Sequence, residues 1–180
     1  MKPVLSHPLR LTDLPRTKPV HVRLVPDEGQ LEALSDRLDV DVLRKVRLEG
    51  DLAALGKTDW LFQGQLGATI VQPCRVTTHP VTTRVDETLL RTYSATYETP
   101  EGEEAEMPED DSIEPLPGVL DMGDVLEEAL ALVIPDFPRA EGADEIDLSV
   151  APPGAEPIDD DKIKPFAALA SLKARMDKDD

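Results

Sequence analysis

The chain has 180 residues, of which 40% are hydrophobic and 3% aromatic, and a formal net charge of −18. Its longest apolar stretch, residues 129–134, is far shorter than the roughly 20 residues of a membrane span, and its single cysteine, Cys74, has no partner for an internal disulfide. We expect one soluble, cytoplasmic domain over residues 1–180 that starts without a secretion signal.

The N-terminal residues contain three periodic segments. Residues 19–25 alternate apolar and polar side chains, which predicts a strand. Residues 4–10 predict a weaker strand at the edge of a sheet, because Pro8 interrupts them. Residues 26–38 predict a helix, since leucines recur at spacings of three and four residues on one face.

Three longer strands are predicted next. Residues 43–55 read as a strand, although their apolar side chains mix the two periods. Residues 60–70 alternate most clearly, and residues 81–93 are rich in Val and Thr. The short loop between the last two strands favours an antiparallel pair. Gly64 and Gly67 indicate a bulge or a close approach of backbones.

The C-terminal half alternates acidic segments with helical ones. Residues 98–118 are acidic, contain almost no large apolar side chain, and are expected to form a mobile loop. Residues 122–134 predict a helix with Asp121 or Asp124 as its N-cap. An acidic linker and tail over about 140–180 is expected to be partly ordered.

These elements together predict an α+β fold. We expect a mainly antiparallel sheet from the first 93 residues, with the helices near 28–38 and 122–134 packed on it. A further short helix is predicted at residues 165–176, outside this core.

Charge divides the chain into two unlike parts. Residues 92–161 contain 22 acidic residues and one basic residue, Arg139, whereas residues 1–91 are almost neutral, with 13 Lys and Arg against 12 Asp and Glu. A field of this sign repels phosphate backbones and anionic lipids and attracts basic proteins. The alternative is that the acidic residues form a solvated segment that keeps the chain soluble.

Catalytic and metal sites are not indicated. Cys74 and His79 are too few ligands for a structural zinc site, and no Gly-rich oxyanion loop surrounds Cys74 as a nucleophile would require. A small thiol at the end of a strand is the preferred interpretation. Residues 101–111 lack the order of acids that a calcium loop needs. We expect no catalytic residue, no metal and no cofactor.

Six segments follow one another in a specific order: 48–50, 62–68, 74–81, 119–130, 134–138 and 165–173. This order resembles the YceD family, the large ribosomal RNA subunit accumulation proteins, and the resemblance covers roughly residues 5–175. It implies a role in accumulation of large-subunit ribosomal RNA and a link to a small basic ribosomal protein. Many members carry a second cysteine close after the first, where this chain has Thr77, and some carry more near the positions of Arg139 and Ala140.

We therefore expect a non-enzymatic ribosome-assembly factor that binds a basic ribosomal protein or assembly factor, with any contact to ribosomal RNA indirect and none to membrane. The expected partner-binding residues are acidic and lie close together: Glu101, Glu103, Glu104, Glu106, Glu109, Asp110, Asp111 and Glu114.

The alternative is a module that binds ribosomal RNA directly through the near-neutral N-terminal half. Lys and Arg contacts dominate affinity for nucleic acid. The residues that would supply them, if they gather on one face of the sheet, are Arg44, Lys45, Arg47, Arg75, Arg84 and Arg91.

Overall fold

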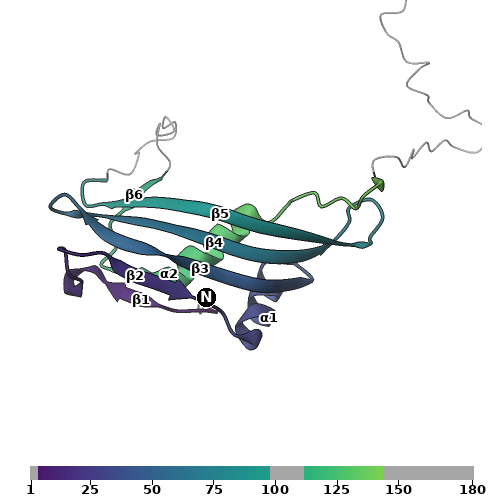
Figure 1. Ribbon diagram of the computed structural model, residues 1–180, viewed down its shortest axis with the longest axis horizontal. Helices are drawn as coiled ribbons and strands as arrows, with labels where there is room; N and C mark the ends of the chain where they lie inside the picture. Colours follow the sequence, from purple (N-terminus) through teal and green to yellow (C-terminus); the bar gives the residue numbers. More distant parts are fainter. Residues whose placement is uncertain (1–3, 98–111, 144–180) are drawn as a thin grey trace, which may run out of the picture. The chain divides into compact units, whose positions relative to one another are not determined.

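The computed structural model describes residues 4–97 and 112–143 (Figure 1). The chain divides into two units, Met1–Ala140 and Glu141–Asp180, and every element described below belongs to the first. The helix predicted at residues 165–176, and the tail beyond residue 143, lie outside the described residues, as does most of the acidic loop, residues 98–111.

The main sheet has five strands, and the α+β prediction is confirmed. Four neighbouring strands pair antiparallel, and a fifth, short strand is parallel to the fourth. In their order across the sheet they are β2 (Val20–Leu24), β3 (Val42–Leu55), β4 (Asp59–Pro73), β5 (Pro80–Ser94) and β6 (Ile113–Pro115).

The strand predicted at residues 4–10 does not join this sheet. It shortens to β1 (Pro8–Arg10), which a 3-10 turn at Leu11–Asp13 follows. β1 pairs antiparallel with β7 (Val119–Asp121), more than 100 residues later in the chain. The proline lies at the end of a three-residue strand, where a missing N–H costs little.

β6 corrects the prediction of an unbroken loop over residues 98–118. Ile113–Pro115 has no alternating pattern that would indicate a strand, but the N–H of Thr92 donates to the carbonyl of Ser112 at 2.8 Å and that of Leu116 to Ser94 at 3.0 Å. These parallel contacts with the end of β5 define the strand, so its formation depends on tertiary pairing rather than on local sequence.

Helix α1 (Glu28–Arg37) begins where a capping box forms. The side chain of Asp27 accepts from the Gln30 N–H at 2.9 Å, and the Gln30 side chain accepts from the Asp27 N–H at 2.9 Å. Two backbone donors that the helix leaves free are thereby satisfied. Leu34 is fully buried, and Leu31 and Leu38 are partly buried beside it, as the predicted apolar face requires.

Helix α2 (Met122–Val133) lies across one face of the sheet (Figure 1). Of the two candidate caps, Asp121 is the N-cap, and its carboxylate accepts from the Gly123 N–H at 2.8 Å. Ile134 is extended because Pro135 follows it, which ends the helix.

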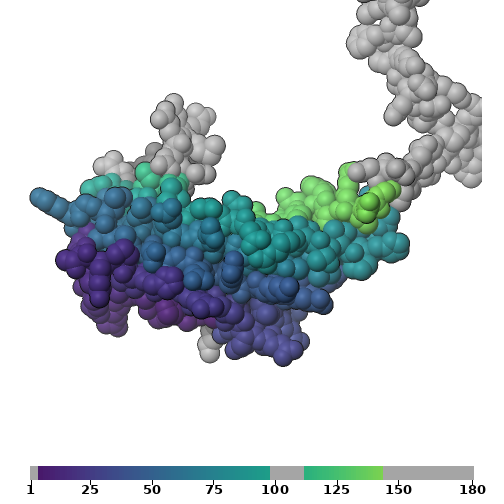
Figure 2. All heavy atoms as spheres, in the orientation of Figure 1, coloured from purple at the N-terminus to yellow at the C-terminus, as the bar shows by residue number. Residues whose placement is uncertain are grey.

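The core lies between α2 and the alternating face of β4. Trp60, Phe62, Leu66 and Ile70 of β4 are all at most 1% exposed, and Leu126 and Leu130 of α2 are fully buried with them. Burying each large apolar side chain contributes about 1.5–3 kcal/mol. This layer therefore fixes which face of the sheet the helix covers, and it leaves the opposite face of β2–β5 without a helix (Figures 1 and 2).

Two glycines allow β3 and β4 to approach closely. Gly50 pairs with Gly64, and a Cβ on Gly50 would lie 2.4 Å from the Gly64 Cα and 2.5 Å from the Gln63 carbonyl oxygen. A Cβ on Gly64 would meet the Phe62 ring at 2.7 Å. The close backbone packing expected at Gly64 is confirmed.

A bulge explains why residues 43–55 mix two periods. The register with β4 shifts between Arg44 and Arg47, and Lys45 adopts a positive φ of 52°. The extra residue changes which face the following side chains occupy, so Val46 and Leu48 are both buried. A strict alternation therefore fails at this point although the strand continues.

β5 has one long open edge. It pairs with β4 along its whole length, whereas β6 covers only Thr92–Ser94 on the other side. Within the part of the chain that the structure describes, no strand pairs with that side of β5 from Pro80 to Arg91.

Candidate interaction surfaces

The acidic segment predicted to bind a partner is inserted between two neighbouring strands. Residues 98–111 contain eight acidic residues and no Lys or Arg. The chain enters this segment after β5 and leaves it before β6, and these strands pair through Thr92 and Ile113. Seven of the eight expected partner-binding acids, from Glu101 to Asp111, lie outside the described residues, and the eighth, Glu114, lies in β6.

Glu114 already has a basic partner within the chain. Its carboxylate pairs with Arg91, whose other terminal nitrogen donates to Glu128 of α2 at 3.0 Å. The Arg91 side chain is 13% exposed, and it lies on the same face of the sheet as α2. This network joins β5, β6 and α2, and it assigns Glu114 a structural contact.

Tyr93 lies beside this network and is almost completely buried, at 1% exposed. Burial, with the nearby Glu114 carboxylate, raises the pKa of its hydroxyl. Among the described residues the hydroxyl has no hydrogen-bond partner. Because Tyr93 is buried beside Glu114 and Glu128, we assign it to the interior at this end of the sheet.

Three of the six candidate RNA-binding residues share the open face of the sheet. Arg44 and Arg84 both lie opposite Thr69, one on each side of it, and Arg47 lies opposite Gly67 in the next row. All three side chains are exposed. Figure 2 shows this face, on which β2–β5 lie in front of most of α2.

An acidic side chain reduces the charge of this group. Arg84 forms a two-point ion pair with Asp86, and this hydrogen bonding lowers the pKa of Asp86 below its ordinary value. A Cβ on Gly67 would lie 2.7 Å from an Arg84 nitrogen and 3.2 Å from Arg47 Nε, so the glycine provides the space that these side chains occupy.

The other three basic residues lie elsewhere. Lys45 is at the bulge of β3, and Arg91 lies on the opposite face in the network with Glu114. Arg75 follows β4, where its Nε donates to the Asp136 carbonyl at 3.3 Å. The structure therefore brings Arg44, Arg47 and Arg84 together but does not place all six residues in one patch.

Cys74 occupies a tight turn directly after β4. Its sulfur accepts from the backbone N–H groups of Val76 and Thr77, both at 3.4 Å, and of Ala140 at 3.2 Å. The thiol is 2% exposed. These contacts hold the chain around residue 140 against the turn, consistent with the interpretation of Cys74 as a small thiol at the end of a strand.

The same contacts favour the thiolate. The Thr77 hydroxyl is the largest influence, followed by the Ala140 and Thr77 N–H groups, and together they lower the pKa of Cys74 from 9.0 to about 6. The Thr77 hydroxyl is buried and makes no other hydrogen bond among the described residues, so it is available to donate to the Cys74 sulfur. His79 is exposed and meets Cys74 through backbone atoms only, the Cys74 N–H donating to its carbonyl at 2.8 Å.

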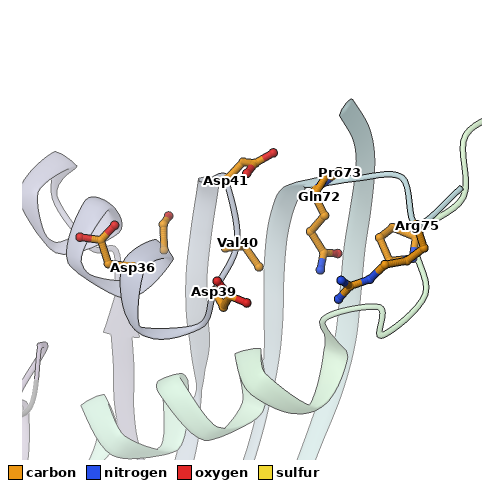
Figure 3. Close-up of a pocket in the computed structure, with 9 residues that line it drawn as sticks. Asp36, Asp39, Val40, Asp41, Gln72, Pro73 and Arg75 are labelled. Carbon is orange, nitrogen blue, oxygen red and sulfur yellow. The ribbon is translucent and has the colours of Figure 1, made fainter. Parts of the chain in front are cut away.

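A polar pocket that the sequence analysis did not identify lies at one end of the sheet (Figure 3). It has a volume of about 460 Å³ between the α1–β3 connection and the end of β4. Asp36, Asp39 and Asp41 line one side, and Gln72 and Arg75 line the other. The corresponding signal in the sequence is three aspartates within six residues, at and just after the end of the predicted helix.

Neither a metal cluster nor a membrane helix is found in the described parts of the chain. Residues 4–97 and 112–143 hold no group of three or more His, Cys, Asp or Glu side chains that could bind a metal. No helix within these ranges has the combined length and apolar character that a bilayer span needs.

The fold and the surfaces described above define an acidic α+β protein. Charged side chains make up its acidic insertion, the arginine group on the open face and part of the polar pocket. Residues 62–173 match the family model of the large ribosomal RNA subunit accumulation protein YceD, so the chain belongs to the YceD family. This family is named for accumulation of large-subunit ribosomal RNA and has no known catalytic activity. The matched region begins within β4, after β2, α1 and β3.

Comparisons with curated proteins and with solved structures found no match.

Proposed function

We propose that this chain supports accumulation of large-subunit ribosomal RNA without catalysis, by holding a basic ribosomal protein or a basic assembly factor. The observation that carries the proposal is the position of the acidic residues. Eight acids without a compensating Lys or Arg are inserted between β5 and β6, so the two ends of the segment are fixed at neighbouring strands of the sheet.

Electrostatics selects the kind of partner. A chain with a net charge of −18 repels a phosphate backbone, for which affinity depends on Lys and Arg contacts. It attracts a basic polypeptide, and such attraction speeds association and weakens as salt screens the charges. Held in this way, a basic ribosomal protein keeps its charge screened until ribosomal RNA displaces the acidic chain.

A variant that neutralises seven of the eight inserted acids, all except Glu98, tests the proposal. Glu101, Glu103, Glu104, Glu106 and Glu109 become Gln, and Asp110 and Asp111 become Asn, whereas Glu114 is retained because it pairs with Arg91. Purified protein from large ribosomal subunits, treated with nuclease, is offered to each variant at low and at high salt. We expect capture of basic proteins by the wild type at low salt and a loss of about tenfold or more in the variant.

Two triple variants form a matched pair. The test variant changes three inserted acids, Glu103→Gln, Glu104→Gln and Glu106→Gln. The control variant changes three exposed acids outside the insertion, Asp13→Asn, Glu32→Gln and Glu87→Gln. Each triple variant loses three negative charges, so a general effect of net charge weakens both equally. Capture that is unchanged by neutralising the insertion at low salt contradicts the proposal.

Direct binding of ribosomal RNA is the second candidate, and the group on the open face favours it. Arg44, Arg47 and Arg84 lie in two adjacent rows of the sheet. If they contact phosphates, Arg44→Ala with Arg47→Ala lowers RNA affinity and makes binding less sensitive to salt. Material that is captured by the wild type and lost on nuclease treatment supports this candidate over the first.

A further inference from the structure

We propose that the pocket between the α1–β3 connection and the end of β4 binds one guanidinium or ammonium group, the side chain of an arginine or lysine of the basic partner. The identity of the partner depends on the proposed function above, whereas the cationic chemistry of the bound group is inferred from the pocket itself. The pocket encloses about 460 Å³ and is lined by Ser35, Asp36, Asp39, Val40, Asp41, Gln72, Pro73, Arg75 and Pro138.

An unsatisfied acceptor is the first observation behind this assignment. Gln72 is 5% exposed, and its Nε2 donates to the Pro135 carbonyl at 3.2 Å. This contact orients the amide, and its Oε1 has no hydrogen-bond donor among the described residues. Figure 3 shows the amide extending into the space between the aspartates and Arg75. A buried acceptor without a donor is unfavourable, so this atom points to a ligand that carries N–H groups.

Charge is the second observation. Asp36, Asp39 and Asp41 are exposed on the side of the pocket that faces Gln72. Arg75 is the one cation among the described lining residues, and its Nε is already directed at the Asp136 carbonyl. Three carboxylates against one guanidinium leave the pocket negative, which favours a cationic group over a phosphate or a carboxylate.

The pocket wall is held in place before any ligand binds. The Val40 N–H donates to the Ser35 carbonyl and the Asp41 N–H to the Val71 carbonyl, both at 3.1 Å. The hydroxyl of Ser35 donates to Leu31 and accepts from the Leu43 N–H at 3.0 Å. A connection fixed in this way loses little conformational freedom on binding, so more of the contact energy is available for affinity.

The arrangement of acceptors fits an extended donor better than a metal ion. The described residues contain no cluster of three His, Cys, Asp or Glu side chains close enough to ligate a metal, so the three aspartates are spread around the pocket. A guanidinium presents five N–H donors in one plane, and an ammonium presents three. Such a group has enough donors to serve the amide oxygen of Gln72 together with a carboxylate.

Titration of the full chain with a small probe tests the pocket without the partner. Nα-acetyl-arginine methylamide and its lysine counterpart are added to ¹⁵N-labelled protein, with the norleucine counterpart as the uncharged control. We expect saturable shifts of the backbone amide signals of Val40 and Asp41 and of the side-chain amide signal of Gln72, with the two cationic probes only. Equal shifts with norleucine, or no saturable shift at these residues, overturn the proposal.

Two variants separate charge from the buried acceptor. Asp39→Asn with Asp41→Asn changes exposed side chains, so we expect it to fold and to weaken the arginine probe at least fivefold. Gln72→Leu removes the acceptor and keeps the charge, and we expect a similar loss. Asp13→Asn is the control, since Asp13 is exposed and outside the pocket. Full affinity in the Asp39 and Asp41 double variant contradicts the assignment even if Gln72→Leu does not fold.

Capture of the basic ribosomal protein connects the pocket with the proposed function. If the double variant binds neither the probe nor the captured protein, the pocket is an anchor for the partner. If the wild type captures a basic protein and the double variant captures it equally well, the assignment of the pocket to that partner is wrong while the proposed function stands. If no basic protein is captured at all but the arginine probe binds, the proposed function fails and the cation specificity of the pocket stands.

Discussion

Arg37 on α1 donates to both carboxylate oxygens of Glu127 on α2, at 3.0 and 2.9 Å, across 90 residues of sequence. The two side chains are only 22% and 23% exposed. This contact joins the two helices that border the sheet, and partial burial makes it stronger than an ion pair in open solvent.

We predict that Glu127→Gln destabilises the protein by about 1–2 kcal/mol, because the partly buried Arg37 guanidinium loses its counter-charge and one of its two accepting oxygens is replaced by an NH2 group that cannot accept. Chemical denaturation measures the free energy of unfolding. Glu32→Gln on the exposed side of α1 is the control, with an expected change within about 0.5 kcal/mol. Equal effects of the two substitutions contradict the role of Glu127.

Asp121→Ala is predicted to destabilise the protein by about 1–2 kcal/mol, because Asp121 is the N-cap of α2. Its carboxylate also accepts from the Ser6 hydroxyl at 2.6 Å and the His7 N–H at 2.7 Å. Partial burial opposes ionisation, but these hydrogen bonds outweigh it and lower the pKa of Asp121 below its ordinary 3.8. The stabilisation is therefore complete above about pH 4 and is lost as the pH falls through the lowered pKa.

Asp124 provides a control of opposite sign in the same helix turn. Burial, followed by repulsion from Asp121 and Glu127, raises the pKa of Asp124 above its ordinary 3.8. Its ionisation on going to neutral pH therefore weakens the fold, and we expect Asp124→Asn to leave stability unchanged or to increase it. A denaturation series from pH 3 to pH 7 distinguishes the two aspartates, and a loss in both variants at pH 7 would sink this account.

The thiol of Cys74 is predicted to titrate with a midpoint at about pH 6, as the thiolate absorbance in the ultraviolet measures. Because its pKa is lowered in the fold, the stabilisation by the thiolate is fully present above about pH 9 and is lost as the pH falls through 6. Thr77→Val removes the largest cause and moves the midpoint toward 9.0, whereas Thr77→Ser keeps the hydroxyl and the midpoint. A midpoint near 9 in the wild type would refute the prediction that contacts within the turn lower the pKa of Cys74.

Gly50→Ala is predicted to destabilise the protein by more than about 2 kcal/mol. The new Cβ would meet backbone atoms of β4 at 2.4 and 2.5 Å, and a paired strand cannot move aside as a flexible side chain does. Gly118→Ala is the matched control, since nothing lies within 4 Å of its added Cβ and we expect a change within about 0.5 kcal/mol. Thermal unfolding of both variants decides the matter, and a well-folded Gly50→Ala of normal stability would show that the strands are not so close.

The long elements followed from the sequence because their patterns are local. The alternation in β4 and the apolar faces of the two helices predicted what is buried, and the short β4–β5 loop predicted their antiparallel pairing. The bulge at Arg44–Arg47 escaped prediction because a single inserted residue imitates a loss of periodicity. β6 and β7 escaped because three-residue strands form through contacts with distant partners rather than through their own pattern.

The candidate sites were harder to predict for a related reason. Charge density identified the acidic insertion, but it did not indicate that Glu114 pairs with Arg91. The six basic residues could be assigned to faces only once the register was known, which separated Arg91 from Arg44 and Arg84. The pocket at Gln72 combines residues from α1, β4 and the segment after α2, and no spacing along the chain connects them.

The free side of β5 has a consequence for handling the protein. Between Pro80 and Leu90 alternate residues of β5 direct their backbone groups away from β4, and no strand of the described chain pairs with them. This edge is open to a second β-strand, including one from another molecule of the same chain. Arg84, Asp86 and Glu87 lie along this stretch as exposed charges, and juxtaposed copies would bring such groups together. Neutralising these three side chains is expected to increase sheet-mediated aggregation when the protein is concentrated.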